Sequence, residues 1–519
     1  MAGIVRQRVF KDTYRDSVEL MRIATDLEHL PGVTRAGVVM ATPANRDLLA
    51  GAGLLLPDAA ETWPADLIVA VAAESDEAGA AAMERAAAAL AGPARPTGEE
   101  RRAAPMTTLH DAMAETPGAN LALVSAPGAY ATAEALKALK RGLHVFLFSD
   151  NVPLADEIAL KELAERKDLL VMGPDCGTAI LDGVPLGFAN AVRRGRIGLI
   201  GASGTGLQEV SCLIDRLGEG VSQVIGVGGR DLDDRVGGRM TLAALRRLAA
   251  DEGTAVIVVI SKPPGAAAAE RVMAAVRQCP KPVVVNFLGW TGEAGGPRTF
   301  EDAALDAVAM ARGVARTALA LEMPDPPPPP PAEPRFAPGQ TEIRGLYCGG
   351  SLAAEAALVL GHTLGDAGAG RAAIVDLGDD RYTTGRLHPM IDPRLRNQHI
   401  VEAARDPRVA VILLDVVLGY NAHPNPARAL IPALDDARQA AAAAGRDLVV
   451  VASVCGTPDD LQDFQRQHTM LAGRRVWLAP SNARAARLAA SALGGAAPSS
   501  VDPRGASRPP GEGRAGGAR

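Results

Sequence analysis

IGLIGASGTGLQEVSCLIDRL, residues 197–217, combines a short apolar run, a glycine-rich turn and a helical repeat of apolar residues. Residues 197–200 have the length and composition of a buried parallel strand. After the turn at residues 201–206, apolar residues recur at the spacing of an amphipathic helix. The segment therefore predicts free N–H groups of a helix N-terminus beyond a buried strand, an arrangement that favours anion binding.

The turn itself has the composition of a phosphate site. Its glycines and hydroxyl side chains are Gly201, Ser203, Gly204, Thr205 and Gly206. No Gly-Lys-Ser/Thr follows, so the turn is not a Walker loop, and its G-x-x-G-x-G spacing is not a dinucleotide fingerprint. An ordinary tight turn between strand and helix is the alternative interpretation.

Composition narrows the class of protein. The chain has 519 residues, which predicts several domains, and 48% hydrophobic residues with only 3% aromatics, so small aliphatic side chains must fill the cores. A net charge of −6 argues against nucleic acid as the main partner. The five cysteines lack C-x-x-C pairing, which indicates neither a disulfide framework nor a zinc site. With no apolar run of membrane-spanning length and no secretory signal, we expect a cytoplasmic protein without a membrane partner.

The first part of the chain predicts two different domains. Residues 1–110 read as a small α+β module, ferredoxin-like, for binding or association. Residues 111–192 alternate strands with helices, which predicts a Rossmann-like, doubly wound parallel sheet. Ligands of such sheets bind beyond the carboxyl ends of the strands, which points to the loops at 126–128, 149–151 and 173–177. Pro174 and Asp175 are the candidates from the last loop.

The rest of the chain is an internal repeat. Residues 193–321 predict a flavodoxin-like lobe, and residues 343–364, IRGLYCGGSLAAEAALVLGHTL, repeat its strand, turn and helix, so residues 341–493 predict a second lobe. A proline run at 326–331 marks residues 322–340 as a linker. Residues 494–519 are rich in Gly, Pro, Ala and Arg and predict a disordered tail. Two such lobes could pack about a pseudo-two-fold axis.

Several motifs resemble succinyl-CoA synthetase. SAPGAYATAEALKALKRGLHVFLFSD and MGPDCGTAIL, within residues 120–180, look like the CoA-binding half of the alpha subunit, and IGLIGASGTGLQE with VIGVGGRDLDD looks like its ligase lobe. VDLGDDRYTTGRLHPMIDP with VILLDVVLGYNAHP is similar to the C-terminal lobe of the beta subunit. With YRDSVELM and VVMATPANRDLL near its start, the chain resembles the FdrA family over nearly its whole length.

Departures from the synthetases are equally informative. The histidine that accepts phosphate in their Gly-His-Ala-Gly setting corresponds here to Glu293, within GEAGG at residues 292–296. No histidine lies between His144 and His362, so the ligase lobe cannot carry a phosphohistidine. An ATP-grasp domain and the lysine-bearing loop used on CoA are not evident. CoA binding and Mg²⁺ therefore stay open, whereas the phosphate cradle is retained.

The resemblance implies an activity. FdrA-type proteins are similar to a subunit of oxamate carbamoyltransferase, from allantoin and purine breakdown, which interconverts oxalurate plus phosphate with oxamate plus carbamoyl phosphate. Transfer from an acyl or carbamoyl phosphate needs positioning and charge stabilisation more than a covalent nucleophile. We expect catalytic roles for Ser203, Thr205, Arg230 and His388. The expected substrate-binding residues are Gly201, Gly204, Gly206, Pro174, Asp175, Gly229, Lys262, Arg381 and Arg386.

Other interpretations stay open. An ADP-forming acyl-CoA synthetase and a non-catalytic scaffold or binding subunit are the rival functions, and partner subunits or a homo-oligomer are expected alongside the small anionic substrate. His388 and His423 could instead bond backbone groups in their loops. Arg230 could simply pair with Asp231 at the surface. Four aspartates could hold Mg²⁺, but capping and turn formation explain them as well, and no metal site is predicted: Asp376, Asp379, Asp380 and Asp415.

Overall fold

The computed structural model describes residues 4–11, 13, 15, 17–57, 62–63, 65–91, 108–289, 299–320, 334–365, 370–383 and 386–494. The chain divides into two compact units. The first comprises Met1–Thr116 with Gly378–Asp392, and the second comprises Pro117–Leu377 with Pro393–Arg519. Most of the predicted linker, the predicted tail after residue 494 and the GEAGG segment lie outside the described residues.

The first unit contains a three-stranded antiparallel sheet in the order β1-β3-β2. The central strand, LIVAVAA, is almost wholly buried, so the helices pack on a continuous apolar surface. The α+β character is as predicted, but β1 and α2 were not predicted, because IVRQRVF and PANRDLLAG are short and rich in polar residues. The elements are β1 (Ile4–Phe10), α1 (Ser17–Glu28), β2 (Val33–Met40), α2 (Pro43–Gly51), β3 (Leu67–Ala73), α3 (Asp76–Ala91), α4 (Leu109–Glu115) and, from the later segment, α13 (Asp380–Thr383).

The second unit begins with a three-stranded parallel sheet in the order β4-β5-β6. Its strands alternate with helices, as predicted for a Rossmann-like domain. The next hairpin, β7–β8, also falls within residues 111–192 but pairs instead with β10 of the following sheet. The elements are β4 (Leu121–Val124), α5 (Gly128–Lys140), β5 (His144–Leu147), α6 (Leu154–Arg166), β6 (Val171–Met172), β7 (Thr178–Leu181) and β8 (Val184–Gly187).

The next sheet forms the N-terminal lobe, with strand order β12-β11-β9-β10-β7-β8. β9 to β12 are parallel, and the hairpin closes one edge in antiparallel orientation. The elements are β9 (Arg194–Ala202), α7 (Gly204–Arg216), β10 (Val221–Gly226), α8 (Arg239–Ala250), β11 (Val256–Ser261), α9 (Ala266–Gln278), β12 (Val283–Phe287), α10 (Phe300–Arg312) and α11 (Arg316–Ala320).

The last sheet forms the C-terminal lobe, with five parallel strands in the order β14-β13-β15-β16-β17. This is the flavodoxin-like order 2-1-3-4-5, and its first four strands match those of the N-terminal lobe. The elements are β13 (Glu342–Tyr347), α12 (Gly350–Leu364), β14 (Ala372–Asp376), α14 (Arg394–Arg405), β15 (Val409–Val417), α15 (Pro426–Ala443), β16 (Val449–Cys455), α16 (Phe464–Ala472), β17 (Trp477–Ala479) and α17 (Asn482–Ala492).

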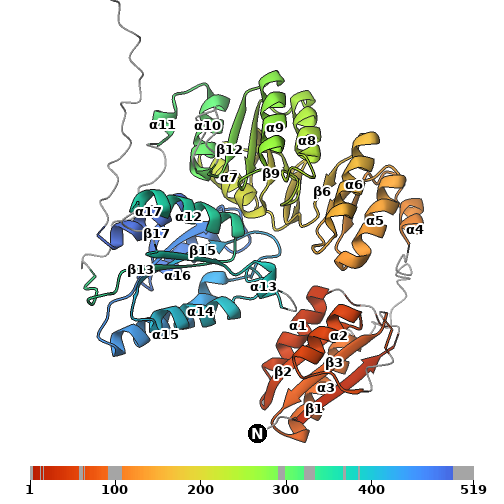
Figure 1. Cartoon of the computed structure of the whole chain (residues 1–519), viewed down its shortest axis with the longest axis vertical. Coiled ribbons are helices and arrows are strands. Elements are labelled where there is room, and N and C mark those ends of the chain that lie inside the picture. The colour runs from red at the N-terminus through yellow and green to blue at the C-terminus, as the bar shows by residue number, and fades with distance from the viewer. Residues whose placement is uncertain are drawn as a thin grey trace, which may run out of the picture. The chain divides into compact units, whose positions relative to one another are not determined.

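The two lobes pack through equivalent helices. In Figure 1, α12 and α17 cover one face of the C-terminal sheet, with α14 and α15 on the other. α7 contacts α10 within its own lobe and α12 across the seam. Most side chains of α7 are buried, as expected for a helix enclosed on two sides. Among the described residues, no helix is both long and apolar enough to cross a bilayer.

Candidate functional site

The first turns of α7 and α12 meet at the seam between the lobes. Ser203 is the N-cap residue of α7, but its hydroxyl makes no capping bond. It donates instead to the hydroxyl of Ser351, with 2.6 Å between the two oxygens. Both serines are buried. Because each helix N-terminus carries a partial positive charge, two of them facing each other favour an anion between them.

Glycines make this approach possible. A Cβ on Gly206 would clash with the Ser203 hydroxyl and lie 2.8 Å from the ring of Phe300. A Cβ on Gly349 would lie 2.9 Å from Thr205 Cγ2. A side chain at Gly349 would therefore push the two helix N-termini apart, and one at Gly206 would displace the Ser203 hydroxyl or the ring of Phe300.

One lysine lies beside the meeting point. A Cβ on Gly350, the first residue of α12, would be 3.2 Å from Lys262 Nζ and would clash with Asp376 Oδ2. Lys262 follows β11 and is exposed. Its ammonium therefore adds positive charge next to the first turn of α12, while Asp376 places a carboxylate near it.

Two further loops run alongside the α7 turn. A Cβ on Gly204 would be 3.5 Å from Thr178 Oγ1, and one on Gly229 would be 3.7 Å from Asp175 Oδ2. The carbonyl oxygen of Pro174 lies 2.5 Å from the position of a Cβ on Gly228. The structure thus places the loop of Pro174 and Asp175 against Gly229 of the loop after β10, and residues 177–178 of the first loop reach Gly204.

Cys176, in the same loop, is not a candidate nucleophile. The side chain is buried, and burial raises the pKa of the Cys176 thiol to about 12. Its Sγ lies 2.6 Å from the position of a Cβ on Gly226. It is therefore a small packing residue.

Arg230 is engaged elsewhere. Its Nε lies 2.8 Å from Glu157 Oε2, and its Nη2 donates to the carbonyl oxygen of Val152. Asp231 is fully buried and pairs with Lys161 at 2.8 Å, so the alternative of an Arg230–Asp231 surface pair is wrong. Arg230 links the β4–β6 domain to the N-terminal lobe, and its catalytic role stays a prediction.

Three predicted residues, Arg381, Arg386 and His388, belong to the first unit and are described with it. Arg381 lies 3.6 Å from Asp379 and stacks on the ring of Tyr382. His388 Nδ1 accepts the N–H of Met390 at 3.2 Å. In the second unit, His423 Nδ1 accepts the N–H of Asn425 at 3.0 Å. His388 and His423 therefore bond backbone groups in their own loops, as the alternative interpretation expected. The substrate-binding roles of Arg381 and Arg386 and the catalytic role of His388 stay predictions.

Buried carboxylates lie behind the α7 turn. Glu355 Oε1 accepts the N–H of Phe300 at 2.5 Å, and Oε2 accepts from Asn482 Nδ2 at 2.8 Å. The N–H of Asn482 donates to Glu209 Oε1 at 3.0 Å. Burial, reinforced by the Glu209 charge, raises the pKa of Glu355 to about 8, so this carboxyl group holds a proton at neutral pH.

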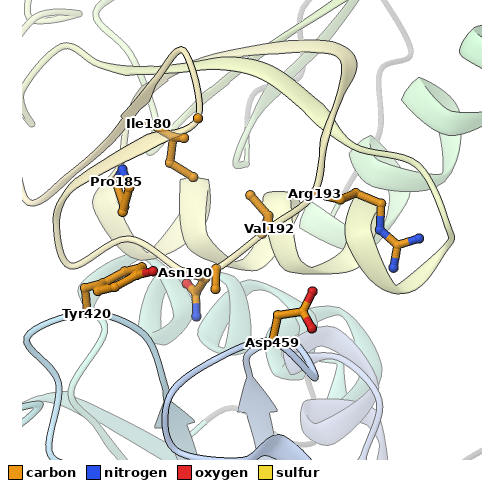
Figure 2. Close-up of a pocket in the computed structure, with 9 residues that line it drawn as sticks. Ile180, Pro185, Asn190, Val192, Arg193, Tyr420 and Asp459 are labelled. Atoms are coloured by element: carbon orange, nitrogen blue, oxygen red, sulfur yellow. The ribbon is translucent and has the colours of Figure 1, made fainter.

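A cavity of about 180 Å³ opens elsewhere on the seam. Figure 2 shows Tyr420 and Asp459 of the C-terminal lobe on one side and the 180–193 segment on the other. Arg193 lies at its edge and pairs with Asp215 at 2.9 Å, while Asn190 donates to the carbonyl oxygen of Leu418. None of the predicted site residues lines this cavity.

The described residues offer few groups that could hold a metal ion or a cofactor. Among the described residues, no group of three or more His, Cys, Asp or Glu side chains could hold a metal ion. The first turn of α5, in the predicted CoA-binding-like domain, faces backbone: a Cβ on Gly128 would clash with the carbonyl oxygen of Asp150 and lie 2.6 Å from that of Asn151. Gly128 therefore packs closely against the backbone of the loop that follows β5.

The sequence did not predict two residues: Ser351, which belongs to the site, and Arg396, which is buried against Asp415 in the C-terminal lobe. Ser351 occupies the position in the repeat that Thr205 occupies in the first lobe, so the repeat itself was an available signal. Arg396, buried in the C-terminal lobe, had none, since it belongs to a helix rich in polar residues.

Three family profiles match the chain: the AllF heavy metal-associated domain over residues 2–105, the CoA binding domain over residues 192–289 and the CoA-ligase over residues 346–492. The assignment of residues 111–192 as the CoA-binding-like domain stays a prediction. Residues 2–105 contain no cysteine and one histidine, His29, so their side chains do not fit a heavy-metal site.

Relatives extend these matches. Succinate–CoA ligase [ADP-forming] subunit alpha 1 of Archaeoglobus fulgidus is 30% identical over 193 residues, 36% of this chain and 64% of that subunit, so the match spans less than two thirds of its length. A solved acetyl-coenzyme A synthetase 1 of Ca. Korarchaeum cryptofilum shares 16% identity at a TM-score of 0.29, over 72% of this chain and 82% of that one. The uncharacterized protein YahF of Escherichia coli is 42% identical over 500 residues, 92% of this chain and 96% of YahF. This chain therefore belongs to the YahF family within the acyl-CoA synthetase superfamily, with an AllF-type N-terminal domain followed by CoA-binding and CoA-ligase domains.

Proposed function

We propose that this protein is an FdrA-type enzyme subunit that binds an acyl or carbamoyl phosphate where α7 meets α12. The proposed reaction is that of oxamate carbamoyltransferase, oxalurate plus phosphate to oxamate plus carbamoyl phosphate. The observation that carries the proposal is the contact between Ser203 and Ser351, with Lys262 beside it. The N-terminus of α7, the hydroxyl groups beside it and a nearby ammonium group are suited to a phosphate dianion.

The proposed reaction requires the two substrates to be positioned and does not require a phosphorylated enzyme intermediate. A phosphate oxygen attacks the ureido carbonyl of oxalurate, the C–N bond breaks, and the departing nitrogen takes a proton to give oxamate. The backbone donors and Lys262 would hold the phosphate in position for the attack. In the reverse direction they would stabilise the negative charge that the phosphate regains as it leaves carbamoyl phosphate. Since no histidine lies between His144 and His362, a route through a phosphohistidine of this lobe is not available. Partner subunits, in a hetero-oligomer or a homo-oligomer, and a cytoplasmic location remain part of the proposal.

Thermal unfolding of the purified full chain tests the proposal. Carbamoyl phosphate, inorganic phosphate, oxamate, CoA and ATP are added separately, because a ligand of the folded state stabilises it by about 2.7 kcal/mol at a hundred times Kd. We expect shifts with carbamoyl phosphate and phosphate. Ser203→Ala should weaken binding about tenfold, on the order of the 1.4 kcal/mol of one hydrogen bond to a charged group.

Lys262→Met should weaken the same response, whereas Lys140→Met, which removes an exposed lysine at the end of α5, should leave it unchanged. Equal responses in both lysine variants would contradict the phosphate site.

The second candidate is an ADP-forming acyl-CoA synthetase. The CoA-binding and CoA-ligase matches and the succinate–CoA ligase relatives favour it. It predicts a shift with CoA and, when an ATP-grasp partner is supplied, acyl-CoA formation. A shift with CoA and none with carbamoyl phosphate would replace the carbamoyltransferase with the ligase, and no shift with any ligand would favour the scaffold.

A further inference from the structure

In the C-terminal lobe, the turn between β13 and α12 binds the side-chain carboxylate of Asp415. Asp415 Oδ1 accepts the N–H of Cys348 at 2.9 Å, and Oδ2 accepts the N–H of Gly349 at 2.8 Å. Gly349 is the N-cap residue of α12. Asp415 thus occupies the backbone donors that precede this helix, as a bound anion would.

Buried groups neutralise and hold this carboxylate. Arg396 Nη1 lies 3.1 Å from Asp415 Oδ1 and also donates to the Asp415 carbonyl oxygen at 2.7 Å. The Cys348 thiol donates to Oδ1 at 3.2 Å, and burial with the nearby carboxylate raises its pKa well above the usual range, so it stays protonated. Asp415 and Arg396 are 0% and 2% exposed. A charge buried this deeply persists only when it is paired and hydrogen-bonded.

At the position that matches Asp415, the N-terminal lobe has no carboxylate. In its sheet, Ile200 pairs with Val259, and Ile260 comes next in β11. In the C-terminal sheet, Leu346 pairs with Leu414, and Asp415 comes next in β15. The N-cap residue of α7, Ser203, comes three residues after Ile200, and the N-cap residue of α12, Gly349, comes three residues after Leu346. The repeat therefore places the apolar Ile260 where the other lobe has Asp415.

We propose that Asp415 is an internal anion that fills the turn before α12, so that the chain accepts one external anion, at the α7 turn. Asp415 and Arg396 are then positioning residues, which hold Gly349 against Thr205 and Ser351 against Ser203. The statement that the external anion is a phosphate on the α7 side rests on the proposed function. The occupation of the α12 turn by Asp415 does not.

Chemical rescue tests the internal anion. Asp415→Ala should lower the melting temperature by several degrees, because it leaves the buried Arg396 guanidinium without its counter-charge and two buried N–H groups without an acceptor. Formate should restore most of this loss in a concentration-dependent manner, because it can take the place of the missing carboxylate. Neutral formamide should not. The double variant Asp415→Ala/Arg396→Met, which removes both charges, should not respond to formate.

Phosphate titration completes the test. The wild-type chain should bind one inorganic phosphate, and Asp415→Ala should bind a second at the vacated turn. No loss of stability in Asp415→Ala, or equal rescue by formate and formamide, would overturn the inference. If the wild-type chain binds no phosphate, the proposed function fails, while the formate comparison still decides the role of Asp415.

A milder variant covers the case in which Asp415→Ala does not fold. Asp415→Asn keeps the volume but turns one acceptor oxygen into a donor that faces a backbone N–H. Hydrogen exchange at the Cys348 and Gly349 amides should then be at least about tenfold faster, equivalent to about 1.4 kcal/mol. Unchanged exchange at both amides would contradict the internal anion.

Discussion

Gly206 shows how a single residue controls the candidate site. It lies in the first turn of α7, between the Ser203 hydroxyl and the ring of Phe300. The glycine-rich turn was recognisable in the sequence, but the sequence did not indicate that the glycine serves a neighbouring helix. Its requirement is steric, because a Cβ here would force the Ser203 hydroxyl away from its position against Ser351.

Gly206→Ala should therefore lower the free energy of unfolding by about 1–3 kcal/mol, the usual cost of overpacking, and weaken phosphate binding. Gly361→Ala is the matched control, because a Cβ at that position in α12 meets nothing within 4 Å. It should raise stability by up to about 1 kcal/mol through helix propensity. Urea unfolding measures both, and equal destabilisation of the two variants would contradict the steric argument.

At the scale of elements, α6 is held to the N-terminal lobe by a buried network of charges. Lys161 lies 2.9 Å from Glu157 and 2.8 Å from Asp231, and all three side chains are fully buried. Asp231 also accepts the N–H and hydroxyl of Thr241, at the start of α8. The network therefore fixes the loop after β10, which carries Gly229 and Arg230.

Lys161→Met should lower the free energy of unfolding by about 3–5 kcal/mol, because it leaves the buried Asp231 without a cation and Glu157 with Arg230 alone. Lys167→Met, at the exposed end of the same helix, should change it by less than about 0.5 kcal/mol. Chemical denaturation of both variants is the measurement. A small effect in Lys161→Met would show that the network is replaceable.

At the scale of the whole second unit, the two lobes share buried carboxyl groups. Glu209 comes from α7 and Glu355 from α12, and Asn482 of α17 bonds both. Burial raises the pKa of both carboxyl groups. The contact between the lobes that brings Ser203 to Ser351 therefore also contains a carboxyl group, Glu355, that is protonated at neutral pH.

This proton predicts a pH dependence. The pKa of Glu355 is about 8 in the folded chain, above its ordinary value of 4.5, so the folded state binds a proton that the unfolded state releases. Stability from this group is complete below about pH 4.5 and is lost as the pH rises to about 8, by about 1.4 kcal/mol per unit. His468, whose pKa burial lowers to about 4, acts in the opposite sense but only below about pH 6.5.

Glu355→Gln should therefore flatten the loss of stability between about pH 6.5 and pH 8. The measurement is urea unfolding at both values, and Glu252→Gln, at an exposed position, is the control and should behave like the wild-type chain. A wild-type slope that persists in Glu355→Gln would assign the pH dependence to other groups.

The sequence alone determined the local elements and their order. Periodicity identified four strands and the first helix of each lobe, and the repeat predicted that the two lobes have similar folds, because these patterns depend on near neighbours. Only the tertiary structure decided which side chains meet. Ser203 and Ser351 are 148 positions apart, and Lys161 and Asp231 are 70 apart. Such pairs leave no periodic signal, because they form only once the packed helices and loops bring distant segments into contact.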